Sequence, residues 1–146
     1  MRITSPAFSN NEMIPAEYTC DGADINPTLK FEDVPEDIKS LALIVDDPDA
    51  IGKTWTHWVV LNIPPETEEI HEDSVPSEAI LAMNDFGHTQ WGGPCPPRGT
   101  HRYRFKLYAL DGEPELEEDM TTSEIEEAIR PHVVDEAILI GLYSRE

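Results

Sequence analysis

The chain has 146 residues, of which 30 are acidic and only 10 are Lys or Arg, so its formal net charge at pH 7 is −20. Its length suits one ordinary domain, and a hydrophobic fraction of 39% predicts a packed core rather than disorder. This charge repels nucleic acid and anionic membrane surfaces, which excludes non-specific binding to either. We therefore expect a single domain over residues 1–146 whose acidic surface serves solubility or a salt-rich cytoplasm.

Neither a leader nor a membrane helix is predicted. No apolar run follows Arg2, and no stretch approaches the roughly 18 apolar residues that a membrane helix needs. We expect no stable membrane insertion and a cytoplasmic location.

The two cysteines, Cys20 and Cys95, lie far apart and lack the CxxC spacing of zinc knuckles or thioredoxin-type redox pairs. Free thiols are the default interpretation. A disulfide stays open, because the fold would have to bring two distant loops together.

Thirteen prolines divide the chain into short segments, which excludes long helices over most of it. Apolar runs bounded by turn formers predict four buried strands, over residues 40–45, 57–63, 101–110 and 137–143. Weaker candidates are short strands over 28–31 and 79–83, and an edge strand over 3–8 that Pro6 interrupts. The pattern predicts a mainly β protein.

One short helix is predicted after Thr121, where Thr121 and Glu124 have the spacing of a capping box. Apolar residues recur on one face before Pro131, namely Ile125, Ala128 and Ile129. We expect this face to pack on the sheet.

Four of the 10 positive charges fall within residues 98–106, and they are Arg98, Arg102, Arg104 and Lys106. In the strand predicted over 101–110, the last three alternate with His101 and Tyr103 and therefore point to the opposite face. Two interpretations stay open: a positive potential beside an anion site, or a solvent-facing side of the strand.

Three polar groups stand at strand ends or in adjoining loops, where a rigid sheet can hold side chains open to a ligand. The first is the run Asp46-Asp47-Pro48-Asp49-Ala50 after the strand over 40–45, which also fits a common turn. The second is His57, which by alternation shares a strand face with Val59 and so also fits a buried core position.

The third group is the most informative, and it reads Gly-Gly-Pro-Cys-Pro-Pro-Arg-Gly-Thr-His-Arg-Tyr over residues 92–103. Its glycines let backbone amides approach a ligand, and its prolines fix the loop shape. His101 and Tyr103 share one face of the following strand. Amide, imidazole and phenol donors are what a phosphate or carboxylate needs.

In this order, the three groups resemble the two signature regions of the phosphatidylethanolamine-binding protein family, especially its bacterial and archaeal Raf kinase inhibitor-like branch. The resemblance covers nearly the whole chain. It includes three further segments: Tyr18-Thr19-Cys20-Asp21-Gly22, Asn26-Pro27 with Leu29, and Asn84-Asp85-Phe86-Gly87.

The resemblance implies an antiparallel β-sandwich with one or two short helices and a pocket for a small phosphorylated or carboxylated anion. Carried over by motif, the residues that line this pocket are Asp47, His57, Cys95, Pro97, His101 and Tyr103. N–H groups of the two histidines and the Tyr103 hydroxyl would donate to the anion, and Asp47 would orient a histidine. The resemblance also implies a kinase or serine protease target and pairing of two chains. We expect no cofactor.

Two other functions compete with this non-catalytic one. Cys95 beside His57 or His101, with Asp47 as orienter, would make a Cys/His hydrolase. Asp47, Asp49, His57 and His101 offer ligand types that suit zinc, although their spacing contains no local metal-binding pair.

Overall fold

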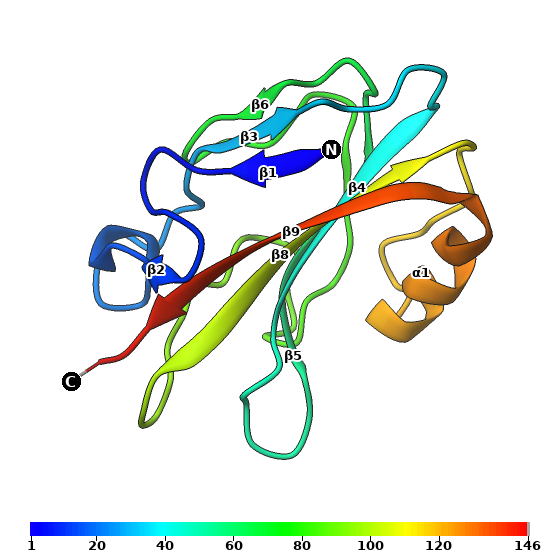
Figure 1. Cartoon of the computed structure of the whole chain (residues 1–146). Helices are drawn as coiled ribbons and strands as arrows, with labels where there is room; N and C mark the ends of the chain where they lie inside the picture. The colour runs from blue at the N-terminus through cyan, green and yellow to red at the C-terminus, as the bar shows by residue number, and fades with distance from the viewer. Residues whose placement is uncertain (146) are drawn as a thin grey trace.

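The computed structural model describes residues 1–145 and folds them into two β-sheets and one α-helix (Figure 1). The six strands of the larger sheet are, in spatial order, β2 (Glu12–Met13), β9 (Val133–Tyr143), β8 (His101–Leu110), β4 (Ser40–Asp47), β5 (Trp55–Ile63) and β7 (Ile80–Leu81). The smaller sheet consists of β1 (Arg2–Thr4), β3 (Leu29–Glu32) and β6 (Glu69–Ile70). The helix is α1 (Thr122–Ile129), and two short 3-10 turns are η1 (Ala16–Tyr18) and η2 (Arg130–His132).

The predicted mainly β architecture is confirmed. Strand β8 has the predicted bounds, and β4, β5 and β9 are longer than predicted by a few residues at one end. Pairing is antiparallel throughout both sheets except between β2 and β9, which run parallel over two residues. That short edge pairing is the one departure, within residues 1–145, from the expected antiparallel arrangement.

The larger sheet has a hydrophobic core on each face. Leu43 and Phe105 point toward the smaller sheet and pack with Phe31 of β3. Ile44, the neighbour of Leu43, points the other way and packs beneath α1. Because side chains alternate along a strand, each central strand serves both cores. The molecule therefore has three layers: the smaller sheet, the larger sheet and the helix (Figure 1).

Helix α1 begins as predicted. The Thr121 hydroxyl accepts from the Glu124 backbone N–H at 3.1 Å, and the Glu124 carboxylate accepts from the Thr121 N–H at 2.9 Å. Ile125 and Ile129 are buried against the sheet, and Pro131 lies in the turn η2 that follows. The capping box and the apolar face thus both have the roles that the sequence indicated.

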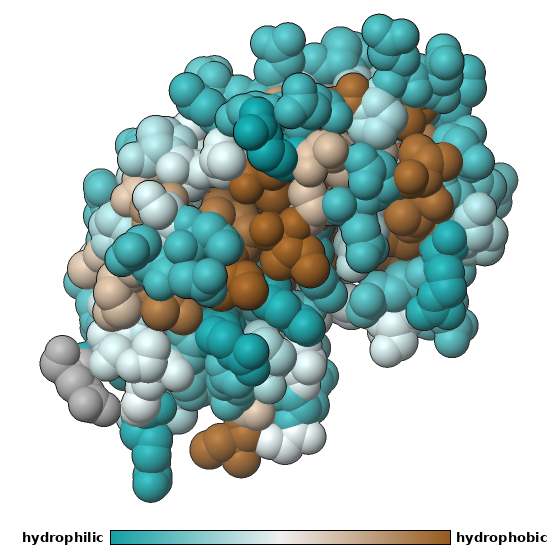
Figure 2. Space-filling model, in the orientation of Figure 1, coloured by the Kyte–Doolittle hydropathy of each residue, from teal (hydrophilic) through white to brown (hydrophobic). Residues whose placement is uncertain are grey.

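Hydrophilic residues cover most of the face shown in Figure 2, and hydrophobic residues appear there in separate patches. No helix within residues 1–145 is long and apolar enough to span a membrane.

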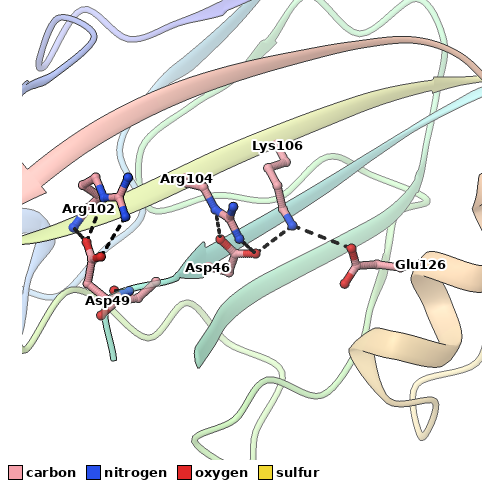
Figure 3. Close-up of polar contacts among 7 residues, drawn as sticks. Asp46, Asp49, Arg102, Arg104, Lys106 and Glu126 are labelled. Carbon is pink, nitrogen blue, oxygen red and sulfur yellow. Dashed lines mark hydrogen bonds and ion pairs between the residues drawn. The ribbon is translucent and has the colours of Figure 1, made fainter. Parts of the chain in front are cut away.

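The cations of β8 are paired with carboxylates on the helix side of the larger sheet (Figure 3). Asp46, which is 2% exposed, accepts from Arg104 at 2.7 and 3.1 Å and from Lys106 at 2.7 Å. Glu126 of α1 lies 3.7 Å from the Lys106 ammonium. Lys106 is itself buried. This face of β8 is therefore neither a positive surface beside an anion site nor a side that simply faces solvent. Its charges are neutralised locally.

Replacing Asp46 by Ala is expected to lower the free energy of unfolding by about 3 kcal/mol, because it leaves buried Lys106 without its closest carboxylate. Asp46→Asn should cost less, since the amide oxygen still accepts. Denaturant unfolding measures both, with Arg2→Ala in an exposed ion pair as the control, expected to cost under about 1 kcal/mol. An Asp46→Ala effect no larger than that control would contradict this account of the pair.

Candidate functional site

A cavity of about 300 Å³ lies at the end of the larger sheet where β4 ends and β5 and β8 begin. Antiparallel pairing brings these three strand ends together, although His101 at the start of β8 lies 54 positions after Asp47 at the end of β4. All six residues carried over by the family resemblance line this cavity: Asp47, His57, Cys95, Pro97, His101 and Tyr103. Five further residues complete its wall: Ala50, Ile51, Trp55, Phe86 and Pro96.

A β-bulge places His57 in this wall. Val45 of β4 pairs with Trp58 of β5, whereas the next residue, Asp46, pairs with Thr56. His57 is therefore the extra residue of β5 at this point, and such a residue bends the strand and redirects its side chain.

The bulge overturns the strand face predicted for His57. Simple alternation placed it with Val59, which packs in the core beneath α1. The structure instead places the His57 ring beside Tyr103, whose ring belongs to the opposite core, at 5.2 Å between ring centres. Pairing between strands sets the position of a bulge, so the periodicity of β5 alone did not reveal it.

The His57 ring is fixed by one short hydrogen bond. Its Nδ1 lies 2.6 Å from the carbonyl oxygen of Gly92. A carbonyl only accepts, so Nδ1 carries the proton, and in the neutral ring Nε2 has a free lone pair. Burial lowers the pKa of His57, and it outweighs the Gly92 carbonyl and the nearby acids, which act in the opposite direction. We had expected the N–H of His57 to donate to an anion. In the neutral ring it instead donates to the Gly92 carbonyl within the protein.

His101 is oriented by Asp47. The His101 Nδ1 donates to the Asp47 Oδ2 at 2.6 Å, and both side chains are buried. The other Asp47 oxygen accepts from the Asp49 backbone N–H at 2.8 Å. Both oxygens of Asp47 are thereby used within the protein, and the carboxylate stands behind the histidine ring. His101 Nε2 is the ring nitrogen left for a ligand.

Tyr103 is the third polar group of the wall and is 1% exposed. Burial, together with the charges of Asp47 and Asp49, raises the pKa of its phenol, so the hydroxyl stays protonated. A hydrogen bond from the Cys95 backbone acts on the pKa of this hydroxyl in the opposite direction and lowers it. A lowered pKa is the effect of a donor, so the Cys95 N–H donates and the Tyr103 oxygen accepts. The Tyr103 O–H is consequently free to donate in another direction.

Cys95 is joined to Cys20 by a disulfide, so the expectation of free thiols is wrong. The bond connects the loop after η1 to the proline-rich loop, and the Cys20 backbone N–H also donates to the Pro94 carbonyl at 3.2 Å. Cys95 therefore lines the cavity as a disulfide-bonded residue whose position is fixed by Cys20. A disulfide sulfur is not a thiolate, which removes the nucleophile of the Cys/His hydrolase hypothesis.

Asp49 is not among the residues that line the cavity, and it pairs with Arg102 (Figure 3). Its carboxylate accepts from Nε and Nη2 of Arg102 at 3.0 and 2.8 Å and from the Arg102 backbone N–H at 2.9 Å. These hydrogen bonds lower the pKa of Asp49 to about 2. Asp49 is therefore not available to a metal ion, and residues 1–145 contain no cluster of three or more His, Cys, Asp or Glu arranged to hold one.

Sequence reasoning missed the aromatic side of the cavity. Phe86 lies edge-on to His57 at 5.2 Å and to Trp55 at 5.6 Å. Of the three tryptophans, Trp58 and Trp91 are buried in the core, whereas Trp55 is half-buried in the cavity wall. The motif Asn84-Asp85-Phe86-Gly87 was a signal for Phe86, because Asn84 anchors this loop to the His57 carbonyl at 3.0 Å.

A second hollow, of about 350 Å³, lies between α1 and the β4–β5 end and includes Asp46, Lys53, Asp85 and Glu126. Two of its acids are paired closely: Lys53 lies 3.1 Å from Asp85, and Asp46 is held by the cations of β8. Throughout residues 1–145, no buried side-chain nitrogen or oxygen lacks a hydrogen-bond partner. No buried side-chain nitrogen or oxygen of this hollow is therefore left unpaired for a ligand.

Comparison with known proteins gives one consistent result. The sequence model described as phosphatidylethanolamine-binding protein matches residues 4–144. A UPF0098 protein of Methanothermobacter thermautotrophicus is 47% identical over 150 aligned positions, which cover 99% of each chain. A crystal structure described as a phosphatidylethanolamine-binding protein homologue from Chlamydia trachomatis has 39% identity and a TM-score of 0.94, covering 99% of this chain and 97% of that one. Escherichia coli YbcL, described as a member of the mammalian family, has 30% identity and a TM-score of 0.93, covering 99% and 98%.

Removing the disulfide is expected to lower the free energy of unfolding by about 2–4 kcal/mol, because the bond closes a long loop in the unfolded chain. Both cysteines are exposed, so a thiol reductant should lower the melting temperature of the wild type and leave Cys20→Ser/Cys95→Ser unchanged. Two free thiols in the denatured, unreduced wild type would contradict the assignment.

Stability is expected to fall as the pH drops below 6.5 because of His57. Its pKa is lower in the folded state, so the unfolded chain binds more protons in that range, and protonation favours unfolding. His57→Gln should flatten this part of the stability–pH curve, measured by denaturant unfolding without added phosphate. His71→Gln, which changes an exposed histidine, should keep the wild-type curve. Identical curves for wild type and His57→Gln would refute the effect.

Proposed function

The chain belongs to the phosphatidylethanolamine-binding protein family, and on that premise we propose that it binds the phosphoryl or carboxylate group of a small anion in the cavity between β4, β5 and β8. The observation that carries this proposal is the convergence of Tyr103 and His101 on one cavity. Each has its other hydrogen bond satisfied from behind, by the Cys95 backbone and by Asp47. Both therefore present a preorganised polar atom to a ligand.

The binding chemistry follows from these partners. The Tyr103 O–H donates to one anion oxygen, and the Nε2–H of a protonated His101 donates to another. Asp47 balances the charge of the protonated ring through the bond at Nδ1. Asp47 itself lines the cavity, so the positive charge of the protonated ring is what offsets its repulsion of the anion. Hydrogen bonds to charged groups are the stronger kind, which suits a site with few donors.

The apolar wall strengthens these interactions. Trp55, Phe86 and the prolines around Cys95 limit water in the cavity, and hydrogen bonds are electrostatically stronger where the effective dielectric constant is low. The cavity volume of about 300 Å³ is at the lower end for ligand pockets, which favours a small ligand. On a chain of net charge −20, such a site must attract its anion locally.

The proposed function is a binding one. Inhibition of a protein kinase or a serine protease and pairing of two chains, which the family resemblance implies, stay predictions, and so does a cytoplasmic location. The disulfide weakens the case for the cytoplasm, because such bonds are rare in the reducing cytosol of most organisms.

Calorimetric titration with phosphate and O-phosphorylethanolamine at fixed ionic strength tests the site. We expect saturable binding to the wild type and a loss of about tenfold or more in affinity for His101→Gln, because charge-assisted hydrogen bonds contribute about 1.5–3 kcal/mol. Glutamine can still donate to Asp47, which protects the fold. The ligand should also raise the melting temperature of the wild type.

The matched control is His71→Gln, since His71 is exposed and lies outside the cavity wall. It should bind like the wild type. Absence of binding by the wild type, or equal weakening by the two variants, would mean that this cavity is not the anion site.

A further inference from the structure

The polar atoms that face the cavity are not all donors. Tyr103 supplies a fixed donor, because its hydroxyl stays protonated and its oxygen already accepts from the Cys95 backbone. His101 Nε2 donates or accepts according to the protonation of the ring, with Nδ1 bound to Asp47 in either case. His57 differs from both.

His57 presents an acceptor. Its only ring proton in the neutral state lies on Nδ1 and is directed at the Gly92 carbonyl, 2.6 Å away. Its Nε2 makes no hydrogen bond within residues 1–145, and no buried side-chain nitrogen there lacks a partner, so Nε2 is open to the cavity. Burial keeps the ring neutral by lowering its pKa. The lone pair on Nε2 therefore faces the place where an anion would sit.

The surroundings of His57 do not reverse this assignment. Phe86 and Tyr103 cover its ring edge-on, each at 5.2 Å between ring centres. The acids that act on the ring are Asp47, Asp46 and Asp24, and their attraction for a proton is outweighed by burial. Burial thus disfavours a second proton on this ring, although the three acids and the Gly92 carbonyl act in the opposite direction.

A fully deprotonated oxygen placed against that lone pair would be repelled, and a lone pair sealed off without a donor carries a desolvation cost. An oxygen that bears its own hydrogen would instead donate to Nε2 while its neighbours accept from Tyr103 and His101. Phosphate groups differ in whether one of their oxygens bears a hydrogen. A monoester monoanion carries a P–OH, whereas a diester, the form of phosphate in a phospholipid, carries none.

We propose that His57 Nε2 is a specificity-determining acceptor that selects oxyanions bearing an O–H, so that the cavity takes phosphomonoesters as monoanions in preference to phosphodiesters. The selection rests on the proposed anion-binding function and names the ligand class for that same site. It distinguishes free phosphorylated metabolites from the head group of an intact phospholipid.

Methyl phosphate and dimethyl phosphate test the selection by calorimetric titration at pH 5.5, where most of each is a monoanion. We expect methyl phosphate to bind the wild type about tenfold or more tightly, as an unpaired acceptor sealed in a site typically costs. In His57→Phe, which removes the acceptor and keeps a ring of similar size, the two affinities should become nearly equal. A preference that persists in His57→Phe would mean that size, and not His57, discriminates, which would overturn the proposal.

Proton uptake by the wild type gives a second measurement that needs no variant. At pH 7.5, titration in two buffers of different ionisation enthalpy should show that methyl phosphate takes up about one proton more than dimethyl phosphate, because its dianion must gain the P–OH hydrogen. Equal uptake would overturn the proposal.

The outcomes distinguish a failure of the selecting role of His57 from a failure of the anion site itself. If both esters bind equally well, the anion site stands and the role of His57 as a selecting acceptor fails. If neither ester nor inorganic phosphate binds, the proposed function itself fails.

Discussion

The hydrogen bond between Asp47 and His101 is the constraint on which the site depends. It joins the last residue of β4 to the first residue of β8, and it exists because these neighbouring antiparallel strands end and begin at the same edge of the sheet. Adjacent residues on a strand face opposite ways, so Asp47 meets the histidine while Asp46 meets Arg104 and Lys106 on the helix side. Two neighbouring acids thereby support two unrelated structures, a ligand cavity and a buried ion-pair network.

The rest of the cavity is rigid for reasons that lie outside it. The disulfide ties the proline-rich loop to the loop after η1, and the Cys95 backbone in turn meets the Tyr103 hydroxyl. Asn84 fixes the opposite loop to the β5 backbone at His57. Each polar atom of the wall is thus positioned by a covalent or hydrogen-bonded partner behind it, which is how a small site attains specificity with few groups.

Features that depend on local pattern could be predicted from the sequence. The bounds of β8, the capping box at Thr121 and the common face of His101 and Tyr103 follow from alternation and turn chemistry. Features that depend on contacts between distant segments could not. The bulge at His57 is set by pairing with β4, and the Cys20–Cys95 bond by the meeting of two loops. The partners of Arg104 and Lys106 required knowledge of which strand lies beside β8.

A crystal structure of the protein with bound phosphate would test the central claim most directly. The account predicts one phosphate in the cavity, with one oxygen within hydrogen-bonding distance of the Tyr103 hydroxyl and another within that distance of His101 Nε2. Asp47 should keep its bond to His101 Nδ1. Phosphate ordered elsewhere on the surface, with this cavity holding only water at saturating concentration, would contradict the account.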